Sequence, residues 1–229
     1  MSYPNYWFMS AIKNNLAELR RMIPPRVRII AVSKTKSVAD IQLAYDAGQR
    51  DFGENYVQEM LEKVPHLPSD IVWHAIGHLQ TNKVKFVAPF IHYIHSVDSE
   101  KLLVEIEKQA EKNNRTINCL LQFHIATEES KFGFRAHNYQ EALDQISWER
   151  FPHLKIAGVM GMASFVENQK QLENEFDTLL NIFLDLKQRY FSNTESFKEV
   201  SMGMSADWPI AVEHGSTMVR IGSSIFGTR

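Results

Sequence analysis

The sequence alternates between short apolar runs and longer amphipathic segments, and this alternation restricts the possible fold more than any other feature. Runs rich in Val, Ile and Phe, bounded by turn-forming residues, indicate strands that are buried on both faces. Eight such runs occur, at residues 27–34, 51–55, 71–77, 91–98, 117–126, 154–164, 197–205 and 216–227.

The segments between these runs have the spacing of amphipathic helices. Residues 37–48 begin with Ser37, a suitable N-cap, and end at Gly48, a suitable C-terminal stop. Two further segments carry an apolar stripe of helical period, made by Leu102, Leu103, Ile106 and Ala110 in one and by Leu172, Phe176, Leu179, Leu180 and Phe183 in the other.

Strands that alternate with helices predict a parallel sheet with right-handed crossovers. Eight units in 229 residues match a (β/α)₈ TIM barrel near its minimum size. An open doubly wound sheet is the alternative. We favour the barrel because the eighth run lies close to the end of the sequence and no unit lacks its helix. An extra helix at about 8–22 precedes the barrel (about 27–229), and the absence of a linker predicts one domain over 1–229.

Composition and charge exclude several classes of function. The net charge of −2 gives no basic excess, so we expect no nucleic-acid partner. The single cysteine, Cys119, rules out an intramolecular disulfide, and the histidines lack metal-site spacing, so we assign no metal. The sequence contains neither an 18-residue apolar stretch nor a convincing signal peptide. We therefore expect no membrane partner and a cytoplasmic location.

The stretch "AVSKTK" places a lysine at the predicted mouth of the barrel. Side chains alternate along a strand, so Ile30, Val32 and Lys34 share one face. Barrel active sites lie at the carboxyl ends of the strands. Desolvation over this apolar layer would lower the pKa of Lys34 and make it a better nucleophile toward a carbonyl. Lys36 has the same parity but lies beyond the strand, so position favours Lys34; the alternative is that both lysines are simply solvated.

Two glycine–serine clusters follow the last two predicted strands. "RIGSSIFG" contains Gly222 and Ser223, and "GMSAD" contains Ser205. Barrels often bind phosphate with the loops after strands seven and eight, so the pair of clusters indicates a phosphate site. Arg220 lies within an apolar run and must have a partner, which is either a structural salt bridge or the ligand above it.

Two polar residues end the second and third runs. Asn55 follows "FGE", and His74 lies in "WHAIG". Both could line the mouth of the barrel. For His74, a hydrogen-bonded histidine in the core is an equally good interpretation.

Seven motifs along the chain resemble those of the pyridoxal phosphate homeostasis protein family, the YggS/PROSC proteins. They run in order from about residue 28 to the C-terminus and read "AVSKTK", "AGQRDFGENYVQE", "WHAIGHLQTNK", "SKFGF", "VMGM", "SMGMSADW" and "GSTMVRIGSSIFG". The resemblance implies a barrel of the alanine racemase N-terminal type (fold type III) that binds pyridoxal 5′-phosphate (PLP) at its mouth.

The resemblance also implies a role for individual residues. Lys34 corresponds to the lysine that forms the Schiff base with PLP, and Arg220 to an arginine that faces the pyridine nitrogen. Phosphate contacts map onto Ser205, Gly222 and Ser223. Asn55 maps to a residue beside the cofactor.

The family resemblance implies a protein that stores or supplies PLP within vitamin B6 homeostasis, without evident catalytic turnover. Related racemases draw a tyrosine from a second domain and a partner subunit, and we expect no such domain here. An arginine near the pyridine nitrogen would disfavour protonation of that nitrogen and weaken the electron sink. A PLP-dependent racemase-like enzyme is the alternative, and a barrel enzyme that does not use PLP is a more distant one.

A supply function requires release of the aldehyde. Lys36, Lys83 and Lys131 lie in predicted loops on the mouth side and are candidate secondary lysines that would intercept PLP by transimination. Apo forms of PLP-dependent enzymes would be the acceptors. We expect the chain itself to be a monomer.

Overall fold

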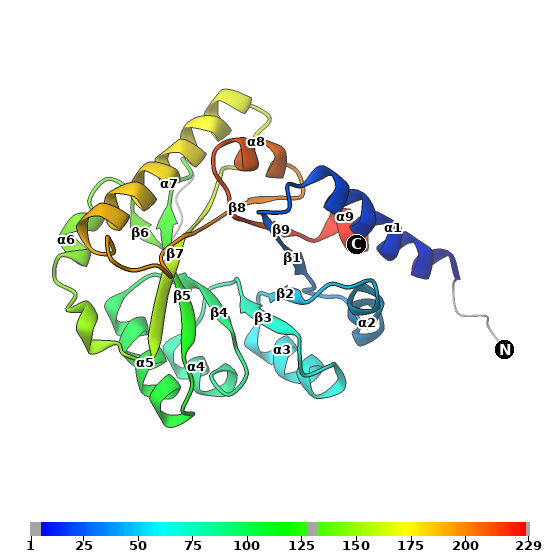
Figure 1. Cartoon of the computed structure of the whole chain (residues 1–229), viewed down its shortest axis with the longest axis horizontal. Coiled ribbons are helices and arrows are strands. Elements are labelled where there is room, and N and C mark those ends of the chain that lie inside the picture. The colour runs from blue at the N-terminus through cyan, green and yellow to red at the C-terminus, as the bar shows by residue number, and fades with distance from the viewer. Residues whose placement is uncertain (1–5, 128–131, 228–229) are drawn as a thin grey trace.

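The chain forms a closed barrel of eight parallel strands (Figure 1). The prediction of a barrel is therefore confirmed, and the alternative, an open sheet, is wrong. The computed structural model describes residues 6–127 and 132–227, with side chains from residue 11 onward. The order is β4-β3-β2-β1-β9-β8-β7-β5, and a β4–β5 pairing closes the ring. The barrel strands are β1 (Arg28–Val32), β2 (Asp51–Glu54), β3 (Val72–Ala75), β4 (Tyr93–Val97), β5 (Ile117–His124), β7 (Leu154–Met162), β8 (Glu199–Met204) and β9 (Met218–Ile221).

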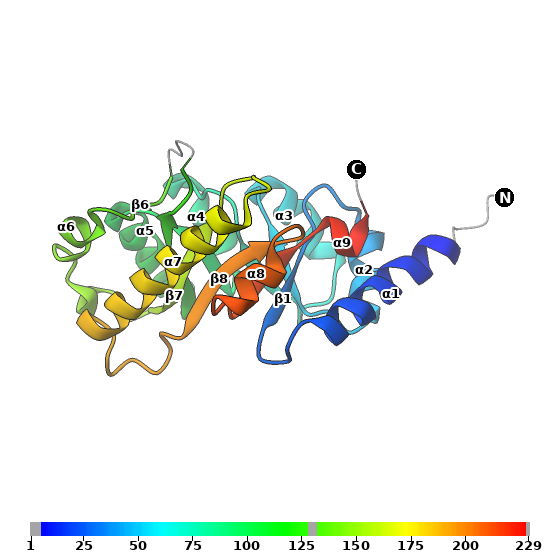
Figure 2. The same ribbon diagram turned by 90° about the horizontal axis from the view of Figure 1, so that it is seen from above.

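Helices surround the strands on the outside of the ring (Figures 1 and 2). Ser37 caps the helix after β1 through a capping box with Asp40, and Gly48 follows the same helix with a positive φ of 87°, which confirms both predicted boundaries. The α-helices are α1 (Tyr6–Met22), α2 (Val38–Asp46), α3 (Val57–Lys63), α4 (Thr81–Val87), α5 (Glu100–Lys112), α6 (Tyr139–Leu143), α7 (Gln169–Arg189), α8 (Trp208–Glu213) and α9 (Ser223–Phe226), with 3₁₀ turns at Val64–His66 and Trp148–Arg150.

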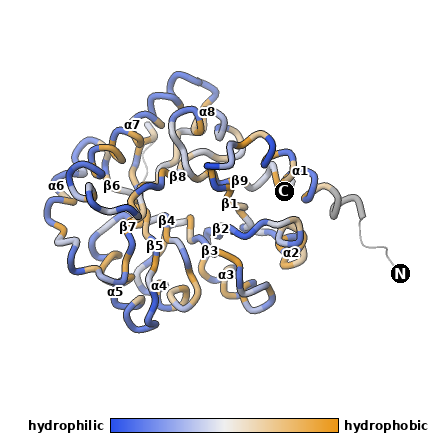
Figure 3. Tube along the Cα trace, viewed as in Figure 1, coloured by the Kyte–Doolittle hydropathy of each residue, from blue (hydrophilic) through white to orange (hydrophobic). Residues whose placement is uncertain are grey.

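The apolar core has two parts, and the alternation along β1 decides which residue enters which. Ile29 and Ala31 belong to the large cluster between strands and helices. Ile30 belongs to a small cluster inside the barrel with Leu120, Ala157, Met160 and Met218. This division confirms the predicted parity of the first strand. Figure 3 shows hydrophobic positions along the strands, with more hydrophilic positions on the surrounding helices.

Two details differ from the sequence-based expectation. A two-residue strand, β6 (Phe134–Arg135), pairs with the end of β5 outside the ring and was not predicted. The first strand ends at Val32, two residues before Lys34. A turn follows, closed by a 3.0 Å hydrogen bond from the N–H of Lys36 to the carbonyl of Ser33, and Thr35 within it adopts φ = 64°, which is incompatible with a strand.

The extra N-terminal helix braces the end of the barrel. In both views α1 lies beside α9, the short helix after the last barrel strand (Figures 1 and 2). The side-chain amide of Asn15 donates a 3.0 Å hydrogen bond to the carbonyl of Ile225. The predicted helix at about 8–22 thus supports the loop that the sequence marks as a phosphate site.

Candidate functional site

A cavity of about 390 Å³ opens at the end of the barrel where the strands terminate. Val32 and Ile76 form part of its apolar wall. The cavity brings together seven residues that the sequence singles out, namely Lys34, Lys36, Asn55, Ser205, Arg220, Gly222 and Ser223. They come from four separate parts of the chain, so the fold creates this cluster.

Lys34 is half-buried at the cavity wall, on a turn with an uncommon backbone conformation. The next residue, Thr35, is β-branched and occupies the left-handed region, which costs on the order of 1–3 kcal/mol unless neighbours enforce it. Its backbone N–H donates to the carboxylate of Glu59. The amine of Lys63 donates a 2.8 Å hydrogen bond to the carbonyl of Ser33. The turn that carries Lys34 is therefore held from both sides.

A buried ionic network that is not evident from the sequence supports this turn. The Lys63 amine lies 2.8 Å from Oε1 of Glu54 and 2.6 Å from Oε1 of Glu59. The Ser33 hydroxyl donates a 2.6 Å hydrogen bond to the same oxygen of Glu54. Burial raises the pKa of Glu54, against the opposing effect of the hydrogen bonds from Lys63 and Ser33. The i,i+4 spacing of Glu59 and Lys63 was the one available signal, but such pairs are common on exposed helices.

The predicted phosphate loops meet at the cavity. The backbone N–H of Gly222 donates a 3.2 Å hydrogen bond to the hydroxyl of Ser205, which ties the loop after β8 to the loop after β9. A Cβ at position 222 would lie 3.3 Å from the carbonyl oxygen of Val32, so the close approach of β1 favours glycine. Gly222 caps α9, whose first N–H groups lack acceptors within the helix. An anion is favoured at such an end.

Arg220 reaches the cavity from the interior of the barrel. Its Nη1 donates to the carbonyl (2.8 Å) and the hydroxyl (2.7 Å) of Ser201, and its Nη2 to the carbonyl of Gly161 (3.0 Å). Within the described part of the chain its hydrogen-bond partners are these neutral oxygens, so the structural salt bridge considered from the sequence is not found. Burial lowers the pKa of Arg220 to about 10, with an opposing contribution from Asp207, and the guanidinium stays charged at neutral pH.

His74 does not line the cavity; it lies in the barrel interior, as the alternative interpretation has it. Its Nε2 is 3.0 Å from Oδ1 of Asp51, and its Nδ1 is 2.9 Å from Nε2 of His95. The ring stacks on Tyr93 with 4.7 Å between centroids. Burial lowers the pKa of His74 and, more strongly, that of His95.

The three candidate secondary lysines have different positions. Lys36 lines the cavity, and its amine donates to the carbonyls of Phe226 (3.3 Å) and Gly227 (3.2 Å). Lys83 instead lines a neighbouring cavity of about 480 Å³ that shares Asn55 with the first. Lys131 lies outside the described residues.

Two expected absences concern only what the structure describes. Over residues 6–127 and 132–227, no three His, Cys, Asp or Glu side chains gather as a metal site. None of the helices in those ranges is long and apolar enough to cross a membrane. Cys119 is buried, and burial raises the pKa of its thiol well above the usual range.

Comparison with known proteins gives relatives over nearly the whole chain. A family model for the N-terminal domain of alanine racemase matches residues 9–229. A protein of Haemophilus influenzae named pyridoxal phosphate homeostasis protein is 40% identical over 206 residues, which cover 89% of this chain and 85% of the relative. The protein of the same name from Escherichia coli K12 is 34% identical, with 96% and 98% covered.

Solved structures give the same picture of the fold. PipY of Synechococcus elongatus, in a structure with PLP bound, has a TM-score of 0.84 and 35% identity, covering 94% of this chain and all of PipY. Alanine racemase of Bacillus anthracis has a TM-score of 0.74 at 19% identity. This chain covers 56% of that racemase, so the likeness concerns the barrel fold alone.

Proposed function

The chain belongs to the pyridoxal phosphate homeostasis protein family, and on that premise we propose that it binds PLP in the 390 Å³ cavity and contributes to intracellular PLP homeostasis and supply. The observation that carries the proposal is the meeting, in one cavity, of a lysine amine with the paired glycine–serine loops. The amine is that of Lys34, and the loops are joined by the hydrogen bond from Gly222 to Ser205.

The residues of the cavity fit the chemistry of PLP. When bound, PLP supplies an aldehyde and a conjugated ring that acts as an electron sink. Lys34 offers the amine for the aldehyde, and the Ser205, Gly222 and Ser223 loops offer donors for the phosphate. The hydrogen bonds of Arg220 use three of its five N–H donors, which leaves Nε–H and one Nη2–H for a ligand. Asn55 adds an amide to the same wall.

Lys34 is the proposed covalent anchor, in preference to Lys36. The amine of Lys36 already donates to two carbonyls at the end of α9, and withdrawing it would leave those carbonyls without that donor. Within the part of the chain that the structure describes, the amine of Lys34 has no such role, and the hydrogen bonds that hold the turn involve Ser33 and Thr35 instead. A free primary amine is required for attack on an aldehyde.

A holding role is favoured over catalytic turnover. Arg220 remains protonated at neutral pH, so a ring nitrogen beside it is disfavoured as a second cationic site. Among the described residues that line the cavity there is neither a histidine nor a tyrosine. A racemase-like enzyme, the alternative, would have to draw its acid and base from Lys34, Lys36 and Asp207, the described titratable side chains of the cavity other than Arg220. The relatives over most of the chain are named as homeostasis proteins rather than enzymes.

The remaining parts of the proposal concern transfer. We place Lys36, Lys83 and Lys131 as secondary lysines that receive the aldehyde during release, and apo PLP-dependent enzymes as its acceptors. Lys83 is the best supported of the three because its cavity adjoins the first at Asn55. The protein would act in the cytoplasm as a one-domain monomer.

Binding and turnover are tested separately. Purified protein incubated with PLP is expected to retain it through desalting. Retention no greater than that of a protein without a PLP site would overturn the proposed function. Incubation of the loaded protein with L- and D-amino acids is expected to give neither racemisation nor exchange of the α-proton, and turnover of any of them would favour the enzyme alternative.

A further inference from the structure

A continuous series of hydrogen bonds crosses the barrel interior from Arg220 to Asp51, and all of them except the last, at the partly exposed Asp51, are buried. Arg220 Nη1 is 2.7 Å from the Ser201 hydroxyl, which is 3.0 Å from Nδ1 of His95. Nε2 of His95 is 2.9 Å from Nδ1 of His74, and Nε2 of His74 is 3.0 Å from the Asp51 carboxylate. Ser201 and both histidines have no solvent exposure. This series of hydrogen bonds joins the cavity to Asp51, the first residue of β2.

The donors in this chain can point in only one direction. An ionised carboxylate only accepts, so Nε2 of His74 carries a proton and donates to Asp51. Nδ1 of a neutral His74 is then an acceptor, and Nε2 of His95 donates to it. Nδ1 of a neutral His95 accepts the single proton of the Ser201 hydroxyl, whose oxygen accepts from the Arg220 guanidinium. Both imidazoles are thereby fixed as neutral Nε2–H tautomers.

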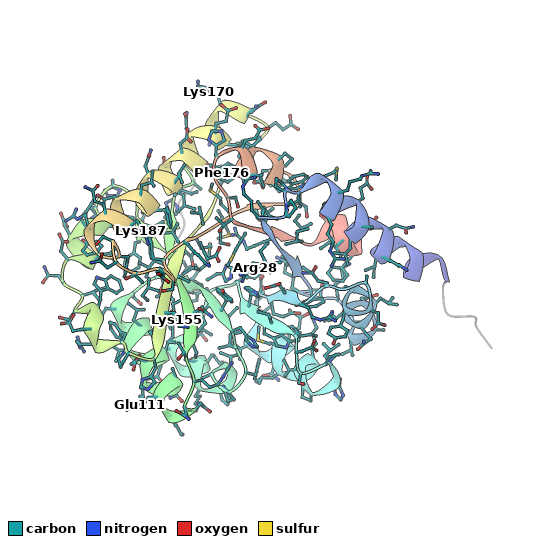
Figure 4. The ribbon with its side chains drawn as sticks, viewed as in Figure 1. Arg28, Glu111, Lys155, Lys170, Phe176 and Lys187 are labelled. Carbon is teal, nitrogen blue, oxygen red and sulfur yellow. The ribbon has the colours of Figure 1, made fainter. Side chains whose placement is uncertain are left out.

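The surroundings of the histidines favour the same protonation states. A proton added at Nδ1 of His74 would face the N–H of His95, so the geometry opposes a cationic pair. Burial lowers the pKa of both rings. Arg28, near the centre of the ring of strands in Figure 4, lies 3.7 Å from Asp51 and keeps that carboxylate paired. The charged and titratable groups around the two rings are Arg28, Asp51, His92, Tyr93, Glu199 and Arg220.

We propose that Ser201, His95 and His74 are positioning residues that orient Arg220 toward the PLP cavity, through a one-directional hydrogen-bond chain that ends on Asp51. This inference rests on the proposed function. The chain holds the Ser201 hydroxyl as an acceptor for Arg220, because its proton is committed to His95. Arg220 is then fixed in one rotamer, with its two remaining N–H groups available to the ligand.

The first test needs no cofactor. Long-range ¹H–¹⁵N spectra of the protein prepared without PLP are expected to show His74 and His95 as Nε2–H tautomers, unchanged between about pH 6 and pH 8. An Nδ1–H tautomer or an imidazolium at either residue in that range would contradict the proposed direction of the hydrogen bonds. This result does not depend on whether the protein binds PLP.

The second test measures the positioning of Arg220. Ser201→Ala removes the hydroxyl but keeps the carbonyl that also binds Arg220. Hydrogen bonds to charged groups contribute about 1.5–3 kcal/mol, so PLP release is expected to be roughly tenfold faster or more. The absorbance maximum of bound PLP is expected to shift, because the cation beside the ring moves. Ser96→Ala is the matched control, since Ser96 is equally buried and its hydroxyl has no partner within the described residues.

The outcomes separate this inference from the proposed function. If wild type retains PLP and Ser201→Ala matches both wild type and Ser96→Ala in release rate and absorbance, the positioning role is wrong and the proposed function stands. A lower unfolding midpoint of Ser201→Ala with unchanged release and absorbance would indicate a structural role only and would also refute positioning. If wild type does not retain PLP, the proposed function fails.

Discussion

The amine of Lys63 lies 2.8 Å from the backbone carbonyl of Ser33, the residue immediately before the cavity lysine Lys34. Lys63 is at the end of α3, and Ser33 follows β1, so the contact joins two consecutive β/α units beneath the site. The same amine also donates to the carboxylates of Glu54 and Glu59, so Lys63 has three hydrogen-bond acceptors. We infer that this buried cation sets the conformation from which Lys34 enters the cavity.

Replacing Lys63 should affect both stability and PLP retention. Lys63→Met keeps most of the side-chain volume but leaves Glu54 buried without its cation. Breaking a buried pair in this way costs about 3 kcal/mol or more in the free energy of unfolding. Urea denaturation measures that loss, and desalting of the loaded protein is expected to show faster release of PLP.

Lys108→Met is the matched control for this change. Lys108 is 71% exposed and lies 4.0 Å from Glu105, so its loss is expected to change the free energy of unfolding by less than about 1 kcal/mol. Equal unfolding midpoints for the Lys63 and Lys108 variants would contradict the structural role assigned to Lys63.

Gly77 is predicted to set the position of Asn55. A Cβ at residue 77 would lie 2.5 Å from the carbonyl oxygen of Asn55, so Gly77→Ala must displace that backbone or its own. Overpacking of this kind costs about 1–3 kcal/mol. Because Asn55 lines the cavity, the dissociation constant for PLP, measured by titration, is expected to rise roughly tenfold.

A glycine far from the cavity separates this effect from general destabilisation. Gly48 has φ = 87° at the end of α2, and Gly48→Ala should cost about 1–2 kcal/mol of stability through backbone strain alone. Its affinity for PLP is expected to equal that of wild type. A wild-type affinity in Gly77→Ala would show that Asn55 does not depend on this close approach.

The buried histidine pair predicts that stability falls in mild acid. The pKa values of His74 and His95 are lowered on folding, chiefly by burial, so the unfolded chain binds more protons as the pH falls. The stabilisation is therefore present above the unfolded histidine pKa of about 6.5 and is lost as the pH drops below it. Two histidines give a limiting slope of about 2.7 kcal/mol per pH unit.

Urea denaturation at a series of pH values measures this slope. His66→Gln, at an exposed position, is expected to retain it. A free energy of unfolding that stays constant from about pH 7 down to about pH 5.5 would contradict the burial of the pair as neutral rings.

Local patterns in the sequence were enough to predict the barrel and much of the cavity. The parity of β1 separates Ile30 from Ile29 and Ala31, and the two terminal loops contain the residues that meet at Gly222 and Ser205. These features depend on strand alternation and loop order, which are readable along the chain.

Other features depend on contacts that form only when the barrel closes. Lys63 ends a helix as an ordinary surface lysine would, and only the packing of α3 against the turn after β1 buries it. The sequence likewise did not decide whether His74 lines the cavity or lies in the core. Its partner His95 comes from the next strand, and the Ser201 that continues the chain lies 106 residues beyond His95.

The most direct test of the account is the identity of the lysine that holds PLP. The loaded protein is reduced with borohydride, digested and mapped by mass spectrometry, with Lys34→Ala and Lys36→Ala treated in parallel. We predict that the reduced PLP is on Lys34 in wild type and in Lys36→Ala, and that the Lys34→Ala protein carries little. Full modification of the Lys34→Ala protein, or modification of wild type mainly at Lys36, would contradict the proposal that the turn after β1 presents the PLP-binding amine.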